Sequence, residues 1–70
     1  MIMEPLAFTA LTVEKIKACF NVIELGTNFF RFSDDGVVYT VTDNGNEWIC
    51  SSADAFVVYG SLEEMEIDFQ

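Results

Sequence analysis

The sequence contains no histidine, and only three of its 70 residues are lysine or arginine. Without histidine, the chain lacks the side chain that most often acts as a general base near neutral pH and as a nitrogen ligand of zinc. Its four glycines form no glycine-rich phosphate-binding loop. A chain this short also rarely encloses a substrate cleft, which takes roughly 300 Å³ or more. We therefore expect a protein that is not an enzyme and that holds no metal or cofactor.

Cysteine is also scarce. Cys19 and Cys50 are the two cysteines of the sequence, which is too few for the disulfide framework of a small secreted protein. We expect both to be reduced and buried as small apolar side chains. The first residues lack the pattern of a signal peptide, and no apolar run approaches the roughly 18 residues of a membrane-spanning helix. These absences predict a protein of the bacterial cytoplasm that has no membrane partner.

What the chain does have is apolar residues and negative charge. Hydrophobic residues make up 51% of the sequence, which is enough to predict a single compact domain over residues 1–70 rather than a disordered acidic tail. The 12 acidic residues give a formal net charge of -9. Every basic residue lies at or before Arg31, where three acidic residues balance them, so nine acidic residues (12 minus 3) follow Arg31 without a basic one. This half cannot neutralise phosphates, which argues against direct binding of nucleic acid.

The N-terminal half predicts one amphipathic helix. Thr12 is a good N-cap, Val13, Ile16, Phe20 and Ile23 follow helical spacing, and Gly26 is placed to end the helix. The preceding segment, residues 1–11, contains the single proline, Pro5, and either begins a helix or packs as an extended arm.

Three strands are expected next, over residues 28–33, 37–42 and 47–51, because aromatic and β-branched residues alternate there. Asp34-Asp35-Gly36 predicts the first turn, and the Asn-Gly pair within residues 43–46 predicts the second. Residues 53–59 fit a helix or a strand about equally well. Residues 64–69 alternate acidic and apolar residues, which favours a strand, with a helix capped by Ser61 as the alternative.

Together these elements predict an α+β fold, in which the N-terminal amphipathic helix packs on a three- or four-stranded antiparallel sheet and the C-terminal segment adds an edge strand. The chain has more aromatic residues than one face of a small sheet needs. We therefore expect Phe29, Trp48 or Tyr59 to face a partner or a second copy of the chain.

The acidic residues are the strongest candidates for a partner-binding site. On a strand, Glu64, Glu66 and Asp68 would form a row on one face, at a spacing of about 6.6–6.8 Å, while Met65, Ile67 and Phe69 anchor the strand to the core. Such a row could imitate the phosphates of a nucleic acid, and the ordinary alternative is a solvating surface. The proposed partner-binding residues are Glu63, Glu64, Glu66 and Asp68, with Asp34, Asp35, Asp43 and Glu47 as a second cluster.

In size, charge and expected fold class, the whole chain resembles small acidic inhibitors encoded by phages: anti-CRISPR proteins, anti-restriction DNA mimics and uracil-DNA glycosylase inhibitors. The resemblance implies an inhibitor that occupies the nucleic-acid-binding groove of a basic protein, such as a nuclease or a CRISPR effector. Two alternatives stay open. One is an immunity protein or antitoxin against a basic toxin, and the other is a structural protein that forms a homodimer through exposed aromatic residues.

Overall fold

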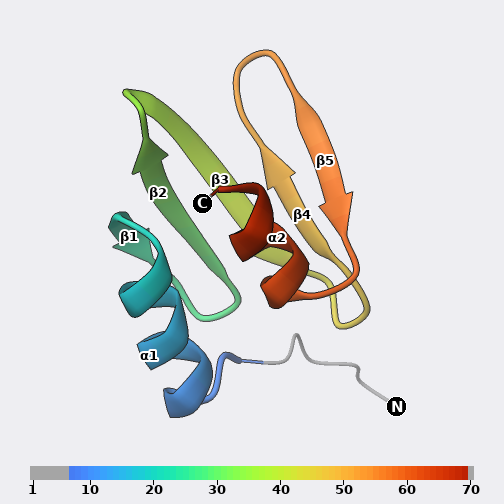
Figure 1. The fold of residues 1–70 in the computed structure, drawn as a ribbon. Helices are drawn as coiled ribbons and strands as arrows, with labels where there is room; N and C mark the ends of the chain where they lie inside the picture. The colour runs from blue at the N-terminus through green and yellow to red at the C-terminus, as the bar shows by residue number, and fades with distance from the viewer. Residues whose placement is uncertain (1–6, 70) are drawn as a thin grey trace.

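The computed structural model describes residues 7–69 and has an α+β fold (Figure 1). In chain order the elements are α1 (Ala10–Cys19), β1 (Val22–Leu25), β2 (Phe29–Asp34), β3 (Val37–Asp43), β4 (Trp48–Ser51), β5 (Phe56–Tyr59) and α2 (Leu62–Asp68). The predicted fold class is thus confirmed, with five strands instead of three or four. Most of the apolar segment before Leu11, including Pro5, lies outside the described residues.

The five strands form one antiparallel meander in the order β1-β2-β3-β4-β5, so every strand pairs with its neighbour in sequence. The turn between β2 and β3 consists of Asp35 and Gly36, whose φ angles of 51° and 80° suit the tight hairpin turns that follow the twist of the sheet. The Asn44-Gly45 pair lies in a longer loop, where Asn44 Oδ1 accepts hydrogen bonds from the backbone N–H groups of Asn46 and Glu47. Both predicted turns are therefore present, and only the first is a two-residue turn.

The N-terminal helix begins and ends earlier than its pattern predicts. Its N-cap is Thr9, whose side chain accepts a hydrogen bond from the backbone of Thr12, and Phe20 already has extended backbone angles. The residues that follow form β1, a strand that the sequence analysis missed. Gly26 lies in the β1–β2 turn, where any side chain would collide with the ring of Phe29. Gly26 thus allows a close turn and does not end the helix.

The C-terminal third settles one open choice and overturns one prediction. Residues 56–59 form a strand, which decides between the two alternatives for this segment. Residues 62–68 form a helix, so the prediction of a C-terminal strand is wrong and β5 is the edge strand. The helix is favoured because Ser61 caps it and because its apolar residues Leu62, Met65 and Phe69 recur at intervals of three and four.

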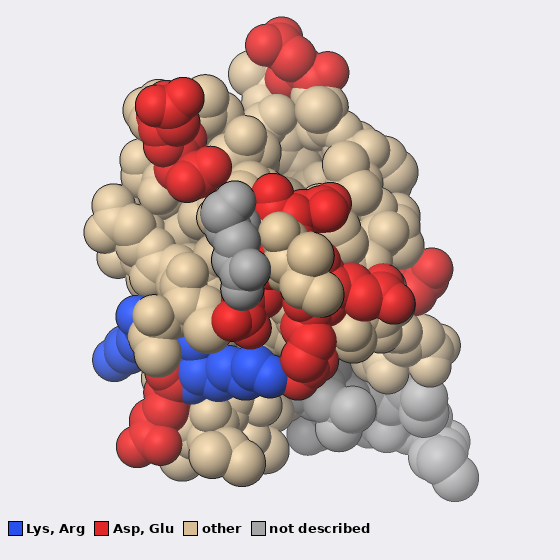
Figure 2. Space-filling model, in the orientation of Figure 1, with Lys and Arg blue, Asp and Glu red and all other residues tan. Residues whose placement is uncertain are grey.

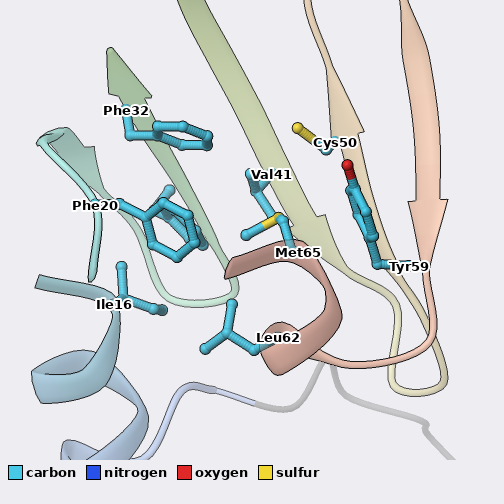
Figure 3. Close-up of a cluster of buried hydrophobic side chains, with 9 residues drawn as sticks. Ile16, Phe20, Phe32, Val41, Cys50, Tyr59, Leu62 and Met65 are labelled. Atoms are coloured by element: carbon cyan, nitrogen blue, oxygen red, sulfur yellow. The ribbon is translucent and has the colours of Figure 1, made fainter. Parts of the chain in front are cut away.

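Both helices cover the same face of the sheet (Figure 1), and the core lies between them and the strands. Every element except β1 contributes a buried side chain to this core (Figure 3). The core residues are Ile16, Phe20, Phe30, Phe32, Val41, Cys50, Tyr59, Leu62 and Met65. Phe20, Phe30 and Phe32 form a mutual aromatic cluster with ring centroids 4.8–5.8 Å apart. Aromatic packing therefore supplies much of the buried apolar area of this small domain.

Candidate functional site

The C-terminal acidic residues lie on α2 and do not form the predicted row. Ser61 Oγ accepts a hydrogen bond from the backbone of Glu64 at 3.2 Å, and Glu64 Oε2 in turn accepts one from the backbone of Gly60 at 3.1 Å. The first bond satisfies an otherwise unpaired N–H group in the first turn of α2, and the second ties Glu64 to the residue before the cap. Glu64 therefore helps to hold the β5–α2 junction. Successive side chains of a helix point in different directions around its axis, so Glu64, Glu66 and Asp68 do not have the even spacing predicted for a strand.

Glu63 joins the two helices, because its carboxylate forms an ion pair with Lys15 of α1. The hydrogen bond from Lys15 lowers the pKa of Glu63, and the same bond raises the pKa of Lys15. Repulsion among neighbouring carboxylates would raise a carboxyl pKa. At Glu63 the shift has the opposite sign, because the chain folds one of its three basic residues onto this site.

At the other end of α2, Asp68 Oδ2 accepts a hydrogen bond from the hydroxyl of Tyr59 at 2.8 Å. Burial raises the pKa of Tyr59 strongly, and the hydrogen bond to the Asp68 carboxylate raises it further. Asp68 thus links α2 to β5 and is nevertheless exposed to solvent.

Glu66 lies near Cys19 of α1, whose thiol pKa is raised first by desolvation and then by interaction with Glu66. Cys19 is exposed, so the prediction that both cysteines are buried holds only for Cys50. Burial raises the pKa of Cys50 to about 11. Both thiols are therefore poor nucleophiles at neutral pH, because only a thiolate attacks efficiently.

The four acidic residues of the predicted second cluster do not lie together. Asp34 ends β2 and Asp35 lies in the β2–β3 turn, both at one end of β3, whereas Asp43 and Glu47 lie at its other end. The strand β3, whose seven residues end at Asp43, spans about 20 Å between the two pairs. Asp43 Oδ1 also accepts a hydrogen bond from the backbone of Gly45 at 2.8 Å, so it stabilises its own loop.

The meander instead brings Asp54 to the same end of the sheet as Asp34 and Asp35. Alternate turns of a meander lie at the same end, which places the β4–β5 turn beside the β2–β3 turn (Figure 1). Asp54 is exposed in that turn. Asp54 is not among the residues predicted from the sequence, because its place in this turn follows only if residues 56–59 form a strand.

Figure 2 shows acidic side chains over the centre of the helix side of the molecule, where α2 lies, and on two projections at the far end of the sheet. We call this the acidic surface, and it consists of Asp34, Asp35, Asp54, Glu63, Glu64, Glu66 and Asp68. Within residues 7–69 there are two ion pairs, Lys15–Glu63 and Arg31–Glu24, the second at 3.3 Å. Every member of the acidic surface except Glu63 therefore lacks a cationic partner among the described residues.

The aromatic residues predicted to face a partner mostly belong to the core side. Tyr59 is buried, and Trp48 stacks on Phe8 with ring centroids 5.5 Å apart. Phe29 is partly buried over Gly26. The exposed aromatic residue is Phe56 of β5, with 66% of its surface accessible.

In the described part of the chain, no three or more acidic or cysteine residues are grouped so that they could hold a metal ion. None of the helices described there has the length and apolar character needed to cross a membrane. The chain matches no protein-family model, no curated protein and no solved structure.

Proposed function

We propose that this chain is a small inhibitor that binds a basic nucleic-acid-handling protein, such as a nuclease or CRISPR effector in the cytoplasm of a bacterial host. The observation that carries the proposal is the acidic surface, whose members other than Glu63 have no cation to neutralise them among residues 7–69. A surface of this kind attracts a basic groove and accelerates association with it. The partner's lysine and arginine residues would supply the missing counter-charges.

The spread of the acidic surface supports a groove as the binding site. The surface runs from the turns at one end of the sheet to α2 over its centre (Figure 2). Carboxylates distributed over such a length can meet several phosphate-binding side chains at once. Asp34, Asp35 and Asp54, at the two turns, are exposed, and none of them takes part in a side-chain hydrogen bond within residues 7–69. Their charge is therefore available to a partner.

A displacement experiment tests the proposal. DNA-binding proteins from a bacterial lysate are retained on DNA-cellulose, the purified chain is added, and released proteins are identified by mass spectrometry at low and high salt. We expect the selective release of one or a few proteins at low salt, which weakens at high salt because screening shortens the reach of charge. An acidic polymer of equal charge concentration serves as the control for non-selective elution. Release that matches this polymer's profile would contradict the proposal.

Matched variants locate the contact surface. The double variant Asp34→Asn/Asp35→Asn removes two charges from the acidic surface, and asparagine tolerates the positive φ of residue 35. The double variant Glu14→Gln/Glu24→Gln removes two charges elsewhere. We expect the first to slow association several-fold and the second to change it little. Equal effects of the two variants would mean that net charge, and not this surface, governs binding.

A second candidate function is self-association, which the open face of the sheet favours. Val38, Phe56 and Val58 lie on the face away from the helices, and each is more than 40% exposed. Two such faces can pack together as in a β-sandwich. Light scattering that gives a dimer mass, reduced to the monomer mass by Phe56→Ser, would support this function.

A further inference from the structure

The two edges of the sheet differ in how they are protected against pairing with another strand. β1 has a register irregularity between Val22 and Glu24, and Glu24 pairs with Arg31 of the neighbouring strand. Bulges and charges are the usual devices that prevent an edge from pairing with other strands. β5 reads Phe-Val-Val-Tyr, with regular pairing to β4 and without charge, proline or bulge. Its sequence therefore leaves this edge open.

The structure of the described residues also leaves β5 accessible. Phe56, Val57 and Val58 are 66%, 43% and 42% exposed, although their side chains alternate between the two faces. Among residues 7–69, β4 is the only strand that pairs with β5. Alternate residues of an edge strand direct their N–H and C=O groups away from the sheet, where they can bind an added strand.

Negative charge marks both ends of this edge. Asp54 lies two residues before β5, in the turn that leads into it. At the other end, the carboxylate of Glu64 lies 3.1 Å from the backbone nitrogen of Gly60, the first residue after β5. The six residue steps from Asp54 to Gly60 span about 20 Å of extended chain. An uncharged strand of apolar residues thus has a carboxylate near each end.

We propose that β5 is a docking edge for an extended apolar segment of another protein, with a lysine or arginine near each end of that segment, about six residues apart. The segment would add a sixth strand to the sheet by backbone hydrogen bonding, and its basic ends would pair with Asp54 and Glu64. The inference goes beyond the proposed function, because it concerns the β5 edge and stands whether or not the partner has a nucleic-acid-binding groove.

The charges favour this occupant over a second copy of the chain. An antiparallel pair of β5 strands centred between Val57 and Val58 would place Asp54 of one copy opposite Ser61 of the other. That position adjoins Glu63 and Glu64, so carboxylates would approach each other at both ends of the pair. Like charges that face one another across strands are destabilising. A segment with basic ends turns the same two positions into attractions.

Two peptides of about seven residues provide the test, since that length matches β5 and its two flanks. Both alternate valine and threonine, and one has lysine at its ends where the other has glutamate. Each is titrated into the isotope-labelled chain while amide resonances are followed by NMR. We expect the lysine-ended peptide to shift the resonances of residues 56–59, and to bind at least about tenfold more tightly than the glutamate-ended one. No shift at β5 at millimolar peptide, or equal binding of both peptides, overturns the proposal.

Two variants with the same substitution locate the contact. Val57→Lys puts a charge in the middle of the open edge, whereas Val38→Lys puts it on an interior strand at a similar exposure of 49%. We expect the first to abolish binding of the lysine-ended peptide and the second to preserve it. Asp54→Asn, which leaves the acidic residues of α2 intact, should weaken that peptide several-fold. If sedimentation shows a dimer of the chain alone that Val57→Lys dissociates, the occupant is a second copy and the proposal is wrong.

Discussion

The two faces of the sheet are built by the same five strands, but one face is covered by the helices and the other is open to solvent (Figure 1). On the helix side, Phe30, Phe32 and Val41 are almost completely buried beneath α1 and α2. On the other side, alternate residues of the same strands, such as Val38 and Val58, stay about half exposed. Because side chains alternate along a strand, the contrast arises from one residue to the next. We therefore expect the free energy of folding to depend mainly on the covered face and much less on the exposed side chains of the open face.

The largest change in stability is expected when one phenylalanine is replaced on the covered face, with a phenylalanine of the open face as the comparison. Phe30 is completely buried and packs on the rings of Phe8, Phe20 and Phe32, so Phe30→Ala should cost about 3–5 kcal/mol of unfolding free energy. Phe56 is mostly exposed, and Phe56→Ala should cost under about 1 kcal/mol. Urea unfolding followed by circular dichroism measures both.

Because a domain of this size has little stability in reserve, Phe30→Leu is the milder companion variant, to be used if Phe30→Ala does not fold. It should remain folded with a lower midpoint than the wild type. A similar loss of unfolding free energy in the Phe30→Leu and Phe56→Ala variants would show that the open face also contributes to stability.

The next test compares two sides of the covering helix α2. Met65 is completely buried against the sheet, so Met65→Ala should cost about 2–5 kcal/mol. Ile67, which the strand prediction assigned to the core, is 67% exposed, and Ile67→Ala should change stability by no more than about 0.5 kcal/mol. Thermal melts of the two variants decide the matter. A costly Ile67→Ala would mean that residues 64–69 pack as the alternating strand after all.

A smaller effect is expected from the hydrogen bond that ties α2 to the covered face. Tyr59→Phe removes the bond to Asp68 and should cost about 1 kcal/mol at neutral pH. The pKa of Tyr59 is raised in the folded chain, so its contribution is complete below the ordinary tyrosine pKa of about 10 and is lost as the pH rises further. Unfolding measured from pH 7 to 11 should show the wild type losing its advantage over the variant. A constant difference across that range would contradict this account.

The smallest effect concerns the ion pair between the helices. The pKa of Glu63 is lowered in the folded chain, so its contribution is present above the ordinary glutamate pKa of about 4.3 and is lost as the pH falls through the folded value. Glu63→Gln should therefore destabilise the chain slightly at pH 7, and this loss of stability should shrink as the pH falls below about 4.3. Glu14→Gln on α1 is the control, because Glu14 has no ion pair among the described residues. A Glu63→Gln effect that stays constant as the protein is acidified would assign the loss of stability to packing.

The central strands could be predicted from the sequence because two independent signals agree there. Alternation in Phe29–Asp34 and Val37–Asp43 identifies the faces correctly, and the Asp35-Gly36 turn fixes their register. The β1 strand could not be predicted in this way, because Ile23 continues the helical spacing of Ile16 and Phe20. Local spacing does not reveal that the backbone becomes extended at Phe20 and that the following residues, β1, pair with β2.

The candidate site was harder to predict, because it depends on which of two patterns in residues 62–69 prevails. Glu64, Glu66 and Asp68 alternate as in a strand, while Leu62, Met65 and Phe69 recur as in a helix. The cap at Ser61 and the burial of Leu62 and Met65 decide for the helix, and only the burial requires the three-dimensional structure. The partner of Glu63 is also invisible in sequence, since Lys15 lies on the other helix.

The order of the strands also has a consequence for how fast the chain folds. Every strand of the meander pairs with the strand before it, so each hairpin closes a short loop and costs little chain entropy. Folds dominated by such local pairing reach the native state sooner than sheets with distant crossovers. The core cluster that includes Ile16 of α1 with Leu62 and Met65 of α2 brings together the most distant elements of the described chain, so it requires the longest loop closure. We therefore expect the hairpins to form early and the core to close when α2 packs against the sheet.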